Sequence, residues 1–406
     1  MHYIEGAINT PKGFKAGGKH IGVKKKRKDL SILYSPTPAV YAGMFTTNQV
    51  KAAPVTWNQA IYQKGTPVKA VVINSGNANA CTGTQGEKDN RVMAEKTASS
   101  LGIQPQEVLV ASTGVIGALL PMDKIVKGIE ELSGEIDDEL LSGINAAEGI
   151  MTTDTTIKNI CVEIELGGKK VTLSGMAKGS GMIHPNRATM LSFITTDAAI
   201  DQELLRKALV EIGKDTYNMI SVDGDTSTND MVMVLANGMA ENEPITDEGE
   251  DYRIFCQALY EINEHLAKEI VKDGEGASKF IEVTLKGAKS KEDARTIVQS
   301  VLNSNLVKTA MFGEDANWGR VLCAMGYSGA KFDPNKVRLV FQSDQEEIVL
   351  LEEGLPVPFD EDRAYKLLQH RDIVISIEME EGKGEAVGWG CDLTYDYVKI
   401  NGEYRT

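Results

Sequence analysis

Hydrophobic positions along the chain form short runs that predict alternating strands and helices. Apolar or alternating runs predict strands at residues 30–35, 39–45, 68–73, 107–111, 158–166, 170–175, 279–286, 337–342, 347–351, 372–378 and 386–398. Helical spacing predicts helices at residues 87–101, 123–133, 137–149, 202–215, 251–272, 290–303 and 360–369. Because this succession has no regular βαβ rhythm, it indicates an α+β fold with helices that cover sheets.

The stretch from Lys178 to Asp197 differs from the rest of this pattern. The segment Gly179–Gly181 interrupts regular structure, and Pro185 fixes its own φ and biases the preceding residue toward extended backbone. The run that begins at Thr189 is apolar and β-branched, which is typical of a buried strand. A threonine therefore stands where an irregular loop enters a strand, with rigid backbone on one side and an open loop on the other. This is a favourable place for a nucleophile.

A threonine nucleophile needs a base, and the chain can supply one by cutting itself. Cleavage between Ala188 and Thr189 frees an α-amino group, whose unperturbed pKa of about 8 lets it accept a proton at neutral pH. Of the five histidines, only His184 lies in this loop. The residues alone leave the alternative open that Thr189 is an ordinary buried threonine of a strand.

Three other stretches carry polar residues that could belong to a site. After the strand expected at 107–111, the Thr113 hydroxyl and the Gly114 backbone N–H can form an oxyanion hole, although a plain turn fits equally. Residues 152–155, Thr-Thr-Asp-Thr, fit a polar turn or cap. The string Ser221–Asp230 resembles a calcium loop, but its spacing is wrong: counted from Asp223, the sixth residue is threonine and the twelfth is valine. We interpret it as a turn that shapes a site.

Composition narrows the class of protein. The 406 residues are 42% hydrophobic and carry a net charge of −15, which argues against a nucleic-acid partner. No apolar run approaches the roughly 20 residues of a membrane span, and the N-terminus lacks a signal pattern, so a cytoplasmic protein is expected. Five cysteines without a C-x-x-C pair fit neither common zinc spacings nor a disulfide framework. The basic run Lys24–Lys28 is interpreted as a solvated loop or strand edge.

The string from His184 to Leu191, H-P-N-R-A-T-M-L, closely resembles the processing motif of the ornithine acetyltransferase family, the glutamate N-acetyltransferases of arginine biosynthesis. That family usually has methionine where Arg187 stands. Ser221–Asp230 and Phe312–Arg320 also resemble family strings, the latter usually with proline in place of Ala316. The resemblance extends from the Asn74 loop to the C-terminus.

The resemblance implies a layered α-β-β-α sandwich of the self-processing N-terminal-threonine type. Cleavage between Ala188 and Thr189 would leave an alpha chain of residues 1–188 and a beta chain of residues 189–406. The two chains are expected to stay together and to form a heterotetramer of two alpha and two beta chains.

The same resemblance implies a ping-pong acetyl transfer from N-acetylornithine to glutamate through an acetyl-Thr189 intermediate. Thr113 and Gly114 would stabilise the oxyanion. The residues expected to position the amino-acid substrates are Thr152, Lys178, Thr189, Glu275, Asn401 and Thr406. No metal or tightly held cofactor is expected, and acetyl-CoA would be a second acetyl donor in a bifunctional enzyme.

Two other functions are alternatives to this one. A self-processing N-terminal-threonine aminopeptidase or amidase would hydrolyse its substrate without an acceptor amino acid, and a carboxylate-binding Lys178 argues mildly against it. A non-enzymatic binding or structural protein would keep its chain intact, with Thr189 as a plain strand residue.

Overall fold

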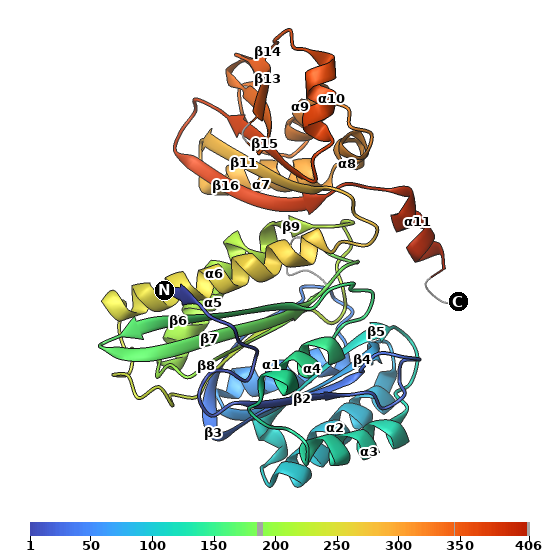
Figure 1. Cartoon of the computed structure of the whole chain (residues 1–406), viewed down its shortest axis with the longest axis vertical. Helices are drawn as coiled ribbons and strands as arrows, with labels where there is room; N and C mark the ends of the chain where they lie inside the picture. The colour runs from blue at the N-terminus through green and yellow to red at the C-terminus, as the bar shows by residue number, and fades with distance from the viewer. Residues whose placement is uncertain (185–189, 345, 404–406) are drawn as a thin grey trace. The chain divides into compact units, whose positions relative to one another are not determined.

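The computed structural model describes residues 1–184, 190–344 and 346–403 (Figure 1). The chain forms two compact units. The first comprises Met1–Gly179, Thr189–Gly213 and Thr226–Leu266, and the second comprises Ser180–Ala188, Lys214–Asp225 and Ala267–Thr406. Among the described residues, no helix combines the length and apolar character needed to cross a membrane.

The first unit is built on a nine-stranded mixed sheet in the order β1-β6-β7-β8-β10-β3-β4-β5, with β2 also paired to β3. Its strands are β1 (His2–Tyr3), β2 (Lys15–Lys19), β3 (Leu30–Phe45), β4 (Val68–Asn77), β5 (Val108–Val115), β6 (Lys158–Leu166), β7 (Lys169–Lys178), β8 (Leu191–Thr196) and β10 (Met231–Ala236). Its helices are α1 (Ala53–Lys64), α2 (Gly83–Leu101), η1 (Pro105–Glu107), α3 (Met122–Ser133) and α4 (Leu140–Gly149), with most of α5 (Gln202–Asp215) and α6 (Glu250–Lys272).

The long strand β3 joins the two halves of this sheet. Its first part pairs with β2 and β4, and after a register shift between Tyr34 and Ala39 its second part pairs with β10. Side chains such as Val71 from one half and Phe193 from the other share one buried core. The sheet therefore folds back on itself as two layers, because both layers present an apolar face to the same core.

Helices cover the outer faces of the two layers (Figure 1). The β3–β5 layer packs Val72 and Val110 against Met93 of α2 and Ile129 of α3. On the other layer α6 lies so close to β7 that a Cβ at Gly175 would come within 2.8 Å of the Ile262 side chain. The expected α+β class and its α-β-β-α layering are confirmed. One local βαβ unit, in which α2 links the parallel strands β4 and β5, was not evident from the pattern.

The second unit has a seven-stranded sheet in the order β14-β13-β12-β15-β11-β16-β9. Its strands are β9 (Ile220–Ser221), β11 (Phe280–Ala288), β12 (Arg338–Ser343), β13 (Glu346–Glu352), β14 (Leu355–Pro356), β15 (Asp372–Glu378) and β16 (Gly384–Cys391). Its helices are η2 (Tyr217–Met219), α7 (Lys291–Asn303), α8 (Asn305–Phe312), α9 (Trp318–Gly326), η3 (Pro334–Lys336), α10 (Glu361–Leu368) and α11 (Tyr395–Gly402). Helices α7 to α10 bury their apolar faces against the sheet in a single core.

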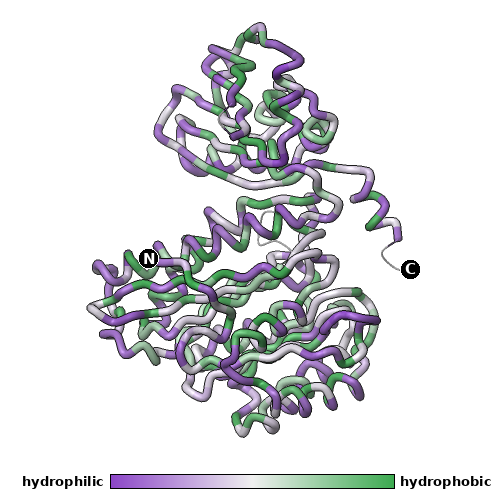
Figure 2. The backbone as a smooth tube through the Cα atoms, in the orientation of Figure 1, coloured by the Kyte–Doolittle hydropathy of each residue, from purple (hydrophilic) through white to green (hydrophobic). Residues whose placement is uncertain are grey.

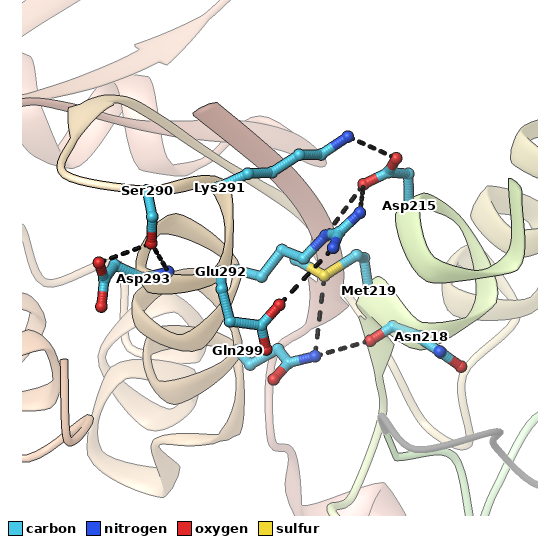
Figure 3. A network of polar contacts seen from close by, with 9 residues as sticks. Asp215, Asn218, Met219, Ser290, Lys291, Glu292, Asp293 and Gln299 are labelled. Carbon is cyan, nitrogen blue, oxygen red and sulfur yellow. Dashed lines mark hydrogen bonds and ion pairs between the residues drawn. The ribbon is translucent and has the colours of Figure 1, made fainter. Parts of the chain in front are cut away.

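Polar contacts attach the segment 214–225 to α7 within this unit (Figure 3). The Asp215 carboxylate pairs with Lys291 at 2.7 Å and with Arg295 at 2.6 Å. Gln299 Nε2 donates to the Asn218 carbonyl at 2.9 Å. These contacts, together with the parallel pairing of β9 with β16, hold in place the backbone that leads to Asp223.

Several predicted elements need correction. The strand expected to run to residue 398 ends at Cys391, because Thr394 caps a new helix, α11, by accepting from the Tyr397 N–H. The strands expected at 30–35 and 39–45 are one continuous strand, β3. The elements that the pattern did not predict include α1, β10, α8 and α9. Elsewhere hydropathy follows the fold, with hydrophobic stretches along the strands and hydrophilic positions along the outer helices (Figure 2).

Candidate active site

Thr113 and Gly114 lie near the end of β5, beside the parallel strand β4. Here the strand continues through Val115, past the turn expected after residue 111. Gly114 has φ of +132° and pairs with Gly76, and a Cβ on Gly114 would lie 2.3 Å from the Gly76 carbonyl carbon. Only glycine allows this approach of the two backbones. The result is a tight backbone arrangement next to the buried hydroxyl of Thr113, which suits an oxyanion hole.

The loop that carries Thr152 is held by the basic run that we interpreted as solvated. Lys24 Nζ donates to the Met151 carbonyl at 2.8 Å, and Arg27 Nη1 donates to the Asp154 carbonyl at 2.6 Å. Lys25 and Lys26 are exposed, so the interpretation holds for these two residues. The run is therefore also a structural brace for the loop on both sides of Thr152.

The carboxylate of Asp154, which is fully buried, joins this loop to the end of β7. Oδ1 accepts from Lys158 Nζ and from the Gly179 N–H, both at 2.7 Å, and Oδ2 accepts from the Thr152 N–H at 2.9 Å. Burial by itself raises the pKa of Asp154, but the charges of Lys158 and Lys178 and these hydrogen bonds hold the pKa below its ordinary value. Asp154 is therefore an anion that fixes two candidate substrate residues, Thr152 and Lys178, through their local backbone.

Lys178 is the last residue of β7 and is only 4% exposed. Its antiparallel partner is Leu191, the first residue of β8. Lys178 thus lies where β7 ends and β8 begins, beside the Thr152 loop that Asp154 attaches. Pattern reasoning missed Asp154 because a Thr-Asp turn is common in polar loops, and the lysine four residues later was its only local signal.

The second unit contributes a separate cluster around Glu275, which is 8% exposed. Asn401 Nδ2, on the last turn of α11, donates to Glu275 Oε2 at 2.7 Å. A Cβ on Gly181 would lie 2.4 Å from the Glu275 carboxyl group, so this glycine makes room for the carboxylate. This hydrogen bond fixes the last turn of α11 beside the Glu275 carboxylate.

Asp223 connects the same parts of the second unit and was not recognised from the sequence as an individual site residue. Its carboxylate accepts from the N–H groups of Met182 and Ile183 at 2.5 and 2.9 Å, and from the Tyr397 hydroxyl at 3.2 Å. Burial raises the pKa of the Asp223 carboxyl. Burial is also the largest of the causes that raise the pKa of the Tyr397 hydroxyl. The segment before residue 185 is thereby attached to helix α11.

The structure brings together Thr152 and Lys178 in the first unit, and Glu275 and Asn401 in the second. Ala188, Thr189 and Thr406, like Arg187, lie outside the described residues. Within the described ranges, no group of three or more His, Cys, Asp and Glu residues is arranged to bind a metal ion.

Comparison with known proteins finds similarity along the whole chain. The sequence model of the ArgJ family matches residues 15–406. The arginine biosynthesis bifunctional protein ArgJ of Caldanaerobacter subterraneus subsp. tengcongensis is 51% identical over 406 residues, which is 100% of both chains. The protein of the same name from Bacillus subtilis strain 168 is 50% identical over 407 residues, covering 99% of this chain and 97% of its own. The crystal structure of the Bacillus halodurans protein of that name is 48% identical, with a TM-score of 0.51, and covers 53% of this chain and 99% of its own.

We predict that Gly114→Ala destabilises the protein more than Gly117→Ala does. Both glycines have positive φ, so both variants share the cost of that conformation. Only at Gly114 does the added methyl group meet backbone atoms, whereas nothing lies within 4 Å at Gly117. In chemical denaturation, the free energy of unfolding of Gly114→Ala should be lower than that of Gly117→Ala by roughly 1–3 kcal/mol. Equal losses for the two variants would contradict the close backbone approach.

We also predict a pH-dependent contribution from Lys24. Burial lowers the pKa of its ammonium from 10.5 to about 8, so the unfolded chain binds more protons than the folded chain between these values. The unfavourable contribution of Lys24 to stability therefore shrinks as the pH rises through this window. The free energy of unfolding of the wild type minus that of Lys24→Met should increase between about pH 7 and about pH 10. The exposed Lys25→Met is the control, and a flat or falling difference for Lys24→Met would refute the prediction.

Proposed function

The chain belongs to the ArgJ family, and we propose that it transfers the acetyl group of N-acetylornithine to glutamate in arginine biosynthesis. The observation that carries this proposal is the match over the full length, at about half identity, to proteins named arginine biosynthesis bifunctional protein ArgJ. The arrangement of Thr152, Asp154 and Lys178 at the start of β8 supports it, since Asp154 holds the backbone of Thr152 and of Gly179 in place beside the buried cation Lys178.

Self-cleavage between Ala188 and Thr189 is the first step of the proposed mechanism. It yields an alpha chain of residues 1–188 and a beta chain of residues 189–406. Strand β8 of the beta chain pairs with β7 of the alpha chain, and β10 pairs with β3, so the cut leaves both chains within one hydrogen-bonded sheet. This pairing supports continued association of the two chains. Their further assembly into two alpha and two beta chains rests on the family resemblance alone.

Thr189 Oγ then attacks the acetyl carbonyl carbon of N-acetylornithine, while its own α-amino group takes the hydroxyl proton. Thr113 Oγ–H and Gly114 N–H stabilise the tetrahedral oxyanion. The carbon–nitrogen bond to ornithine breaks, and the proton held by the α-amino group goes to the leaving amine. The glutamate amine next attacks the acetyl ester through a second oxyanion, and the α-amino group of Thr189 takes a proton from this amine. The ester bond breaks, the same proton goes to Thr189 Oγ, and N-acetylglutamate leaves the free Thr189 hydroxyl.

Two charged side chains are assigned to amino-acid recognition. The Lys178 ammonium is assigned to a substrate carboxylate, because a buried cation binds an anion more strongly than an exposed one does. Glu275, hydrogen-bonded to Asn401, is assigned to a substrate ammonium group. Thr152 and Thr406 are proposed to complete substrate binding.

No metal or tightly held cofactor takes part in these proposed steps. The word bifunctional in the relatives' name leads us to propose acetyl-CoA as an additional acetyl donor to glutamate. A biosynthetic role with free amino acids fits a cytoplasmic location. Hydrolysis of the acyl-enzyme without an acceptor would instead indicate an aminopeptidase or amidase.

Denaturing intact mass tests the self-processing nucleophile. The wild type should give two chains, the second beginning at Thr189, whereas Thr189→Ala should remain whole at 44.1 kDa. Incubation with N-acetylornithine should add one acetyl group to the second chain of the wild type. An uncut wild type that still transfers acetyl groups would exclude the free α-amino group as the base.

Lys178→Met should raise the KM for the amino-acid substrates by roughly 10- to 100-fold, because a hydrogen bond to a charged group contributes about 1.5–3 kcal/mol. Lys170→Met is the matched control, since Lys170 lies on the same strand but its side chain is 79% exposed. Steady-state kinetics with each substrate varied in turn provides the measurement. If KM changed equally in the two variants, Lys178 would not be the carboxylate-binding residue.

A further inference from the structure

Asn229, the residue before Asp230, contacts the strand that carries the candidate oxyanion hole. It is 4% exposed, and its Nδ2 donates to the carbonyl oxygens of Ala78 at 2.7 Å and Ser112 at 2.8 Å. Ser112 is bonded directly to Thr113. One side-chain amide thus uses both of its hydrogens to hold the backbone beside Thr113.

Asp230, the next residue, contacts the strand that follows the proposed nucleophile. Its carboxyl is 2% exposed, and Oδ1 accepts from the N–H of Met190 at 3.0 Å. This N–H belongs to the peptide bond that joins Met190 to Thr189. The other oxygen, Oδ2, is also buried.

The backbone around these two residues is itself fixed. The Thr46 N–H donates to the Asp230 carbonyl at 2.9 Å, and the Met231 N–H donates to the Met190 carbonyl at 3.1 Å. Strand β10, which begins at Met231, pairs with β8 on one side and with β3 on the other. Because Asn229 and Asp230 are adjacent in the chain, one rigid backbone segment carries both the amide that holds Ala78 and Ser112 and the carboxyl that holds the Met190 N–H.

We propose that Asn229 and Asp230 are positioning residues that hold Met190, the residue after the proposed nucleophile, in register with the oxyanion donors Thr113 and Gly114. This inference rests on the acetyl transfer proposed above. Neither side chain is assigned a contact with the substrate. Asn229 holds the backbone next to Thr113, and Asp230 holds the N–H of the residue after Thr189. Thr113 and Thr189 are the residues proposed to touch the substrate.

A positioning role has a kinetic consequence that a substrate-binding role lacks. Formation and breakdown of the acetyl-enzyme both pass through an oxyanion held by the same donors, so a misplaced donor slows both half-reactions by a similar factor. Substrate binding does not depend on this register, so the KM values for N-acetylornithine and glutamate should change little.

The protonation state of Asp230 determines what the conservative variant Asp230→Asn tests. Burial raises the pKa of this carboxyl well above its ordinary value, which favours the neutral acid. An asparagine side chain is also neutral and offers the same acceptor oxygen to the Met190 N–H. Asp230→Asn should therefore preserve the contact that Asp230→Ala removes.

The experiment measures both half-reactions in the full-length protein, per cleaved chain as counted by intact mass. Rapid-quench assays follow acetylation by N-acetylornithine and deacetylation by glutamate. Asn229→Asp, which cannot donate to the two carbonyls, and Asp230→Ala should each slow both rates by roughly 10- to 100-fold. Asp230→Asn should restore most of the rate lost in Asp230→Ala.

Two matched controls occupy the far ends of the same strands. Asp197 follows β8 and accepts from the N–H groups of Lys12 and Thr172. Asn237 follows β10 and donates to the Lys12 carbonyl at 2.9 Å. Asp197→Ala and Asn237→Asp remove buried hydrogen bonds of the same kinds and should lower thermal stability, but leave both rates per cleaved chain unchanged.

The outcomes separate this inference from the proposed function. A wild type without acetyl transfer removes the proposed function and this inference with it. An active wild type with target variants no slower than the controls, or with a raised KM alone, overturns the positioning role. So does a rate for Asp230→Asn as low as that for Asp230→Ala. If Asp230→Ala fails to fold, Asn229→Asp alone decides between these outcomes.

Discussion

The buried strand β8 is the constraint on which the arrangement of the first unit depends. All six of its residues are buried, so each backbone N–H and C=O must find a partner within the protein. Strand β7 supplies partners on one side in antiparallel register, and β10 supplies them on the other in parallel register. A one-residue slip would turn every side chain of β8 to the opposite face, so the register is strongly fixed. Lys178 at the end of β7 and Asp230 before β10 are thereby set beside the start of β8.

Buried carboxyl groups hold loops in place in both units. Asp154 is stable as an anion in the interior because a lysine ammonium and two backbone N–H groups surround it. Loss of one partner of such a buried pair is strongly destabilising, since the remaining charge has no access to water. Asp223 has a comparable place in the second unit, where it gathers the Met182 and Ile183 N–H groups and the Tyr397 hydroxyl. In both units a carboxyl group organises loops that the sheets alone would leave free.

The sequence allowed prediction of those elements whose signal is local. The hairpin of β6 and β7 around Gly167-Gly168 and the amphipathic helix α5 follow directly from periodicity and turn residues. Strand β10 was missed because its apolar run directly follows a long polar string, and α11 was taken for strand because its helix depends on the Thr394 cap. The candidate site followed from motif strings, whereas the connecting residues did not. Asp223 joins residues up to 174 positions away, and no local pattern contains that information.

Partial exchange most directly tests the central claim, an acetyl-enzyme formed on Thr189. The cleaved protein is incubated with N-acetylornithine and isotopically labelled ornithine, with glutamate and acetyl-CoA absent. A covalent intermediate predicts that label enters N-acetylornithine, because free ornithine can take the acetyl group back from the enzyme. If no label enters while transfer to added glutamate proceeds at full rate, both substrates must bind before any acetyl group moves. That result would contradict the account.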